Sequence, residues 1–170
     1  MADKILTTSN PSEPRELYIA RSTRRNQPEH WVLMVRKPGS ERCTFYHLSN
    51  GMPPSTYTRT RLVNRRFEHW YFPVREEIAQ IQAVEEVDVV RAAMETGADH
   101  CQRFVVGVVE RFEGKNLVRK GTAERYRASL QPNLFEGPVR VVSEEEWDGW
   151  VDEMERGEAG WMLMFQQGYL

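Results

Sequence analysis

One stretch, Asp99–Phe112, constrains the fold more than any other part of this chain. Its apolar residues recur at helical spacing and form one stripe of an amphipathic helix: Phe104, Val105, Val108, Val109 and Phe112. Asp99 suits the N-cap of this helix, and Cys101 then lies in the first turn. Unpaired backbone N–H groups and the positive end of the helix dipole favour a thiolate there. The stretch therefore predicts a helix that begins either at a nucleophilic cysteine or at a small buried one.

Length and composition favour one soluble domain. The 170 residues are 40% hydrophobic, which suffices for a single core of ordinary size. A net charge of −2 argues against nucleic acid as a partner. Two cysteines are too few for a disulfide framework, and the sequence contains neither a signal-peptide core nor a membrane span of about 20 apolar residues. We therefore expect a cytoplasmic protein with free thiols, in which residues 1–14 form a flexible arm and residues 15–170 a single domain.

A hairpin with two histidines is the second informative feature. His30–Arg36 and Cys43–Leu48 are rich in branched and aromatic residues and are separated by a turn signal, Pro38–Gly39. If the turn is centred on that dipeptide, His30 lies directly opposite His47. Directly opposed residues of a hairpin share a face, so the two imidazoles are expected to be neighbours.

Facing histidines are compatible with two kinds of site. His30, His47 and a cysteine are all competent zinc ligands, but no close Cys-x-x-Cys or His-x-x-x-His spacing accompanies them, so we expect no metal and no cofactor. The alternative is a Cys-His pair, in which one imidazole takes the thiol proton and the second orients the first. His100 adjoins Cys101, but adjacent residues at a helix start point in different directions, which ranks it below His30.

Three short motifs carry a resemblance to a known family: His30-Trp31-Val32-Leu33, Tyr46-His47-Leu48 and Cys101-Gln102-Arg103-Phe104-Val105. In this order they resemble the lecithin:retinol acyltransferase-like branch of the NlpC-type, circularly permuted papain-like superfamily. The resemblance implies that His30 is the base, that His47 orients it, and that Cys101 attacks an acyl carbonyl. The chain departs from the family pattern in having His100 where Asn is common, and it has no hydrophobic carboxy-terminal anchor. The stretch Arg66–Val118 is also similar to uncharacterised fungal proteins.

Periodicity and turn signals predict the remaining elements. The further strands are expected at Glu16–Arg21, Arg65–Phe72 and Glu77–Val84, and the further helices at Glu85–Met94, Thr122–Leu130 and Ser143–Met154. The expected fold is α+β, an antiparallel β-sheet flanked by helices, and it resembles the circularly permuted papain-like architecture. The tail Trp161–Phe165 is unusually apolar, which predicts either a docked segment or a surface for a protein partner.

Two functions remain open. The resemblance implies a cysteine-dependent hydrolase or acyltransferase, which acts on an amide, ester or thioester of a small-molecule or peptide acyl substrate through an acyl intermediate on Cys101. The alternative is a catalytically inactive member that binds a protein or a ligand. Geometry discriminates between them, because a sulfur within reach of an imidazole favours the enzyme and a buried thiol favours the binding module.

Overall fold

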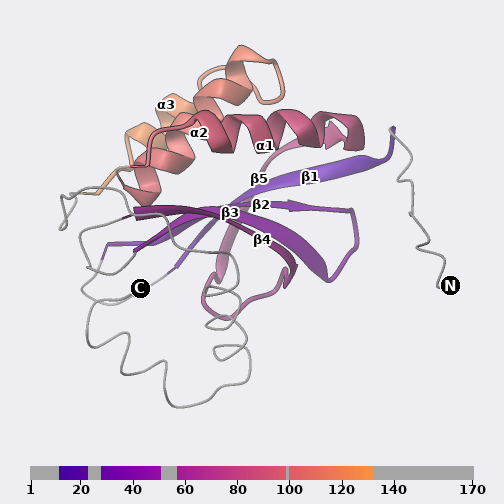
Figure 1. The fold of residues 1–170 in the computed structure, drawn as a ribbon, viewed down its shortest axis with the longest axis horizontal. Coiled ribbons are helices and arrows are strands. Elements are labelled where there is room, and N and C mark those ends of the chain that lie inside the picture. Colours follow the sequence, from indigo (N-terminus) through magenta and orange to yellow (C-terminus); the bar gives the residue numbers. More distant parts are fainter. Residues whose placement is uncertain (1–11, 23–27, 51–56, 99, 132–170) are drawn as a thin grey trace, which may run out of the picture.

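The computed structural model describes residues 12–22, 28–50, 57–98 and 100–131. Within these ranges the chain forms an antiparallel sheet with helices on one face (Figure 1). The strands are β1 (Pro14–Arg21), β2 (Trp31–Arg36), β3 (Arg42–Asn50), β4 (Tyr57–Arg66) and β5 (Val74–Gln82). The helices are η1 (Ala83–Glu85), α1 (Glu86–Glu95), α2 (Cys101–Gly114) and α3 (Thr122–Arg127). The strand order is β4-β3-β2-β1-β5, which places β4 and β5 at the edges of the described sheet and confirms the α+β class.

The central strands β1 and β2 are buried on both faces of the sheet. Alternate residues of β1 and β2 point to the helices, and these are Leu17, Ile19, Trp31, Leu33 and Val35. Their neighbours along each strand point to the opposite side, where they form a second cluster with Phe67 and Phe72 from the β4–β5 connection. This explains why the central strands read as continuous apolar runs, since a strand covered on one face only would alternate apolar and polar residues.

Helix α2 packs its predicted stripe against β2 and β3. All five stripe residues are buried, as the helical spacing predicted. Gly107 lies on this helix where the end of α1 approaches, and a Cβ atom there would be 2.8 Å from Cγ2 of Thr96. The absence of a side chain at Gly107 therefore allows the two helices to pack closely.

One predicted strand is wrong. The chain leaves the sheet at Arg66, and the residues after it, predicted as part of the strand Arg65–Phe72, connect β4 to β5. Asn64 adopts a left-handed conformation (φ 60°), and the pairing of β3 with β4 shifts between Cys43 and Phe45. The aromatic residues of this connection instead cover the sheet face away from the helices.

Strand β4 (Tyr57–Arg66) was missed by the sequence analysis because its arginines obscure the alternation of apolar residues. The predicted helix over residues 143–154 and the aromatic segment 161–165 lie outside the described residues. No helix of the described part is long and apolar enough to cross a membrane.

Candidate active site

His30 and His47 lie side by side, on the face of the sheet away from the helices. Nε2 of His30 is 3.1 Å from Nδ1 of His47, and the ring centroids are 5.3 Å apart. His47 is on β3 in phase with Phe45, which belongs to the second cluster, and the ring of His30 lies 6.0 Å from that of Phe72 in the same cluster. At the distance of 3.1 Å one imidazole donates a hydrogen bond to the other.

The strand register differs from the predicted one by two residues. β2 and β3 pair Leu33 with Tyr46 and Met34 with Phe45, so the turn is centred between Gly39 and Ser40, one residue later than expected. His30 and His47 are therefore diagonal neighbours and not direct partners. A shift of two residues preserves the alternation of side chains, which explains why the histidines still share a face.

His47 makes the folded state sensitive to acid. Burial lowers the pKa of its imidazole from 6.5 to about 4, with a smaller contribution from the charge of Arg65, while a backbone hydrogen bond at Leu48 opposes the shift. Between these two pH values the unfolded chain takes up a proton that the folded chain does not. The contribution of His47 to the free energy of unfolding is therefore complete above pH 6.5 and is lost as the pH decreases toward 4. We expect the free energy of unfolding to fall by about 2 kcal/mol from this residue between pH 7 and pH 5.

Urea unfolding at a series of pH values measures this effect. His47→Asn removes the titrating imidazole, so its free energy of unfolding should decline less steeply below pH 6.5 than that of the unmodified chain. Equal slopes for the two proteins would show that His47 carries no part of the acid sensitivity.

Cys101 begins α2, but its thiol lies in the core on the helix side. The residue is 8% exposed and belongs to the same cluster as Trp31 and Phe104. Burial raises the pKa of the thiol to about 11, although backbone N–H groups of Trp31, Gln102 and Cys101 itself lower it by hydrogen bonding to the sulfur. The direction is opposite to the one predicted from the helix start, because the cost of desolvating a thiolate exceeds the stabilisation that these N–H groups provide.

The sheet separates this cysteine from the two histidines. The Trp31 ring points to the helix side, and His30, the preceding residue, points to the other side. Within the described part of the chain, no hydrogen bond joins the Cys101 sulfur to an imidazole. The structure thus brings His30 and His47 together and leaves Cys101 apart. The Cys-His pair expected between Cys101 and an imidazole is not formed among the described residues, and the three catalytic roles stay predictions from the resemblance.

His100 is the N-cap residue of α2, in place of the predicted Asp99, which lies outside the described residues. Its backbone is extended, and its side chain makes no capping hydrogen bond. The ring packs edge-on against Tyr57 at a centroid distance of 6.2 Å. It therefore contributes to the packing between α2 and β4.

A glutamine pair beside Cys101 was missed by the sequence analysis. The Gln102 amide nitrogen donates to the Glu29 carbonyl and to Oε1 of Gln131, each at 2.8 Å, and the Gln131 backbone N–H donates to Oε1 of Gln102 at 2.8 Å. Gln102 is fully buried three residues before Val105. The sequence did carry a signal for this pair, because Gln102 is a polar residue on the predicted apolar face of the helix. Its buried side chain ties α2 to the segment before β2 and to the chain after α3.

Cys43 shares the histidine face and is also buried. Burial raises the pKa of its thiol to about 12, although the charges of Arg36, Arg75 and Arg42 lower it. Among the described residues, no group of three or more His, Cys, Asp or Glu side chains is placed to hold a metal ion.

Comparisons with protein-family models, curated proteins and solved structures found no match to this chain. The catalytic roles of Cys101, His30 and His47 therefore stay predictions from the motif resemblance.

Proposed function

We propose that the chain is a protein-binding module in which Cys101 has a structural role. The observation that carries the proposal is the state of the thiol, which is buried and has a raised pKa. Nucleophilic cysteines react as thiolates and need an adjacent base or a lowered pKa. In this chain the imidazoles that would supply the base contact each other on the opposite face of the sheet.

The start of α2 supports the same proposal. In a cysteine enzyme, backbone N–H groups at such a helix start bind the developing oxyanion. Here the backbone N–H groups of Trp31, Gln102 and Cys101 lower the pKa of the thiol, but burial raises it by more, so the helix start does not favour a thiolate. The glutamine pair then fixes the helix start against Glu29. These contacts favour a packing role for Cys101 over an acyl-carrying one.

A second candidate function is the cysteine-dependent hydrolase or acyltransferase, with Cys101 as nucleophile, His30 as base and His47 as orienting residue. It is favoured by the imidazole contact of 3.1 Å, which suits an orienting residue and a base. It is also favoured by the effect of the Trp31 N–H, which lowers the pKa of the Cys101 thiol, because the backbone of His30 then lies near the sulfur. Catalysis would require the His30 side chain to turn from His47 toward Cys101.

An acyl thioester probe followed by intact-protein mass spectrometry tests the proposal. A nucleophilic cysteine would retain the acyl group, whereas a structural thiol with a pKa near 11 should remain unmodified at neutral pH. We therefore expect no acyl adduct on Cys101. Cys43→Ser is the control for the second buried thiol. An adduct that persists in Cys43→Ser and disappears in Cys101→Ser would overturn the proposal in favour of the enzyme.

A further inference from the structure

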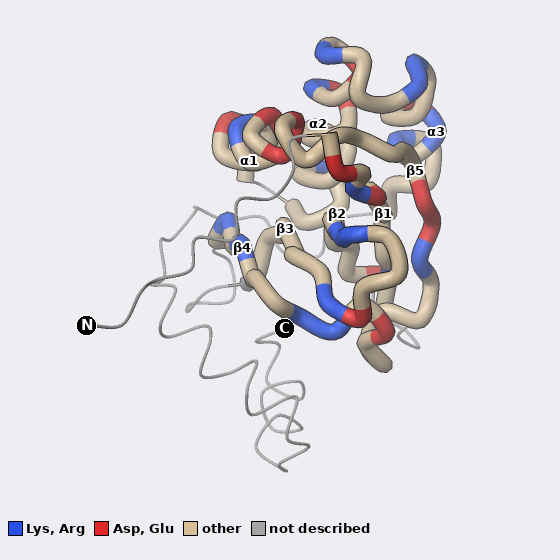
Figure 2. Tube along the Cα trace, turned by 90° about the vertical axis from the view of Figure 1, so that its right-hand side faces the viewer, with Lys and Arg blue, Asp and Glu red and all other residues tan. Residues whose placement is uncertain are grey.

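We infer that the β4 edge of the sheet binds an extended acidic segment of a protein partner by strand addition. The inference rests on the proposed binding function and assigns it a surface. The surface is an arginine stripe on β3 and β4, made of Arg42, Arg59, Arg61 and Arg66. Strand β4 contains no acidic residue over its whole length, so Figure 2 shows it in blue and tan only.

The four side chains share one face of the sheet. The register between β4 and β3 pairs Arg59 with Leu48, Arg61 with Tyr46 and Arg66 with Arg42. Leu48 and Tyr46 point to the helix side, and paired residues point the same way, so the whole stripe lies on that side. All four arginines are exposed.

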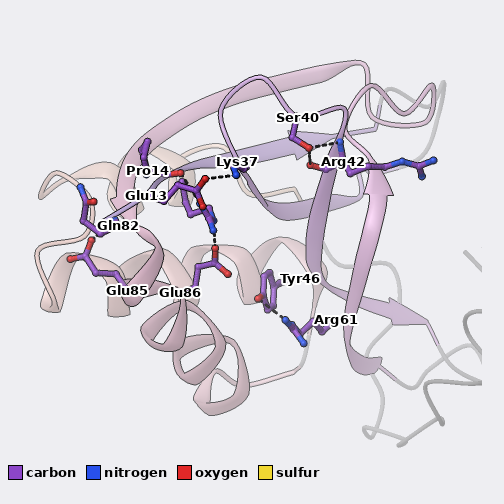
Figure 3. Close-up of polar contacts among 11 residues, drawn as sticks. Glu13, Pro14, Lys37, Ser40, Arg42, Tyr46, Arg61, Gln82, Glu85 and Glu86 are labelled. Atoms are coloured by element: carbon purple, nitrogen blue, oxygen red, sulfur yellow. Dashed lines mark hydrogen bonds and ion pairs between the residues drawn. The ribbon is translucent and has the colours of Figure 1, made fainter. Parts of the chain in front are cut away.

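Neutral groups hold the stripe in place. Arg42 donates to the Asn64 carbonyl at 3.1 Å and Arg59 to the Thr96 carbonyl at 2.9 Å. Arg61 donates to the Tyr46 hydroxyl at 3.2 Å, as Figure 3 shows. Each of these contacts engages one N–H group of a guanidinium that has several and leaves its positive charge uncompensated.

The stripe differs in this respect from other arginines of the sheet. Arg15 and Arg36 form ion pairs with glutamates, but no carboxylate of the described residues pairs with any arginine of the stripe. Arg42 and Arg66 also lie directly opposite each other, and like charges in that arrangement destabilise a sheet. A bound carboxylate would remove this repulsion, so the charge pattern fits an acidic ligand.

The strand edge explains why the ligand is extended. On the outer side of residues 59–63, β4 pairs with no described strand, so the backbone of this segment offers N–H and C=O groups for an added strand. Thr60 and Leu62 alternate with the arginines and face the other side of the sheet. A peptide that alternates acidic and apolar residues therefore matches both faces. A second copy of β4 fits poorly, because it would bring arginines against arginines.

Fluorescence anisotropy with a labelled peptide of alternating glutamate and valine tests the inference. We expect the full chain to bind this peptide, and we expect Arg61→Glu/Arg66→Glu to weaken binding about tenfold or more, because it replaces attraction with repulsion at two positions. Arg119→Glu/Lys120→Glu is the matched control, since it makes the same change in net charge at exposed residues outside the sheet and should bind like the unmodified chain. Circular dichroism verifies that both variants are folded.

Three results would overturn the inference. Equal binding by the two double variants would exclude the stripe. Undiminished binding of the same peptide with N-methylated backbone would exclude strand addition, because methyl groups remove the donors of the added strand. Binding of single-stranded DNA in place of the peptide, with the same dependence on Arg61 and Arg66, would assign the stripe to nucleic acid. None of these results depends on acylation of Cys101, so failure of this surface and failure of the proposed function are distinguishable.

Discussion

In a Cys43→Ser variant, iodoacetamide should modify Cys101 about a hundredfold more slowly at neutral pH than it modifies a free cysteine. Only the thiolate reacts, and burial raises the pKa of this thiol to about 11, far above the roughly 8.5 of a free cysteine. At neutral pH the reactive fraction is therefore small, and the 8% exposure of the residue hinders access as well.

Alkylation followed by mass spectrometry over a range of pH measures this rate. The rate should rise up to strongly alkaline pH, and urea should bring it to that of a free cysteine. His30→Ala should leave the rate unchanged, because the His30 imidazole contacts His47 and not the sulfur. Rapid modification near neutral pH that depends on His30 would instead support the enzyme.

Trp31→Ala should lower the free energy of unfolding by about 4 kcal/mol, a large share of the stability of a domain this size. Trp31 has 0% exposure, packs edge-on against Tyr126 at a centroid distance of 5.8 Å, and donates from Nε1 to the Glu29 carboxylate at 3.1 Å. Its removal leaves a cavity between β2 and α3 next to Cys101. Urea unfolding measures the change.

The second His-Trp dipeptide supplies a matched control. Trp70 follows His69 as Trp31 follows His30, but it is 57% exposed on the β4–β5 connection. Trp70→Ala should therefore cost less than about 1 kcal/mol. Similar losses for the two variants would contradict the packing described for Trp31.

Local sequence determined the elements with strong periodicity or clear ends. The five-residue apolar stripe predicted the buried face of α2, and the branched residues of β2 and β3 predicted the hairpin. These signals are readable because helical spacing and β propensity act within a few residues. The same signals correctly placed the two histidines on one face of the hairpin, since the alternation of side chains survived the change in register.

Only tertiary structure decided which side of the sheet each feature faces. Both faces are apolar, so the sequence contained no signal that α2 covers the face with Trp31 and that the β4–β5 connection covers the face with Phe72. That choice placed Cys101 and the histidines on opposite sides. It also buried the Cys101 thiol. Desolvation by this tertiary packing raises the pKa of the thiol more than the helix start lowers it. The arginine stripe likewise arises from the pairing of β3 with β4, which aligns residues far apart in the sequence on one exposed edge.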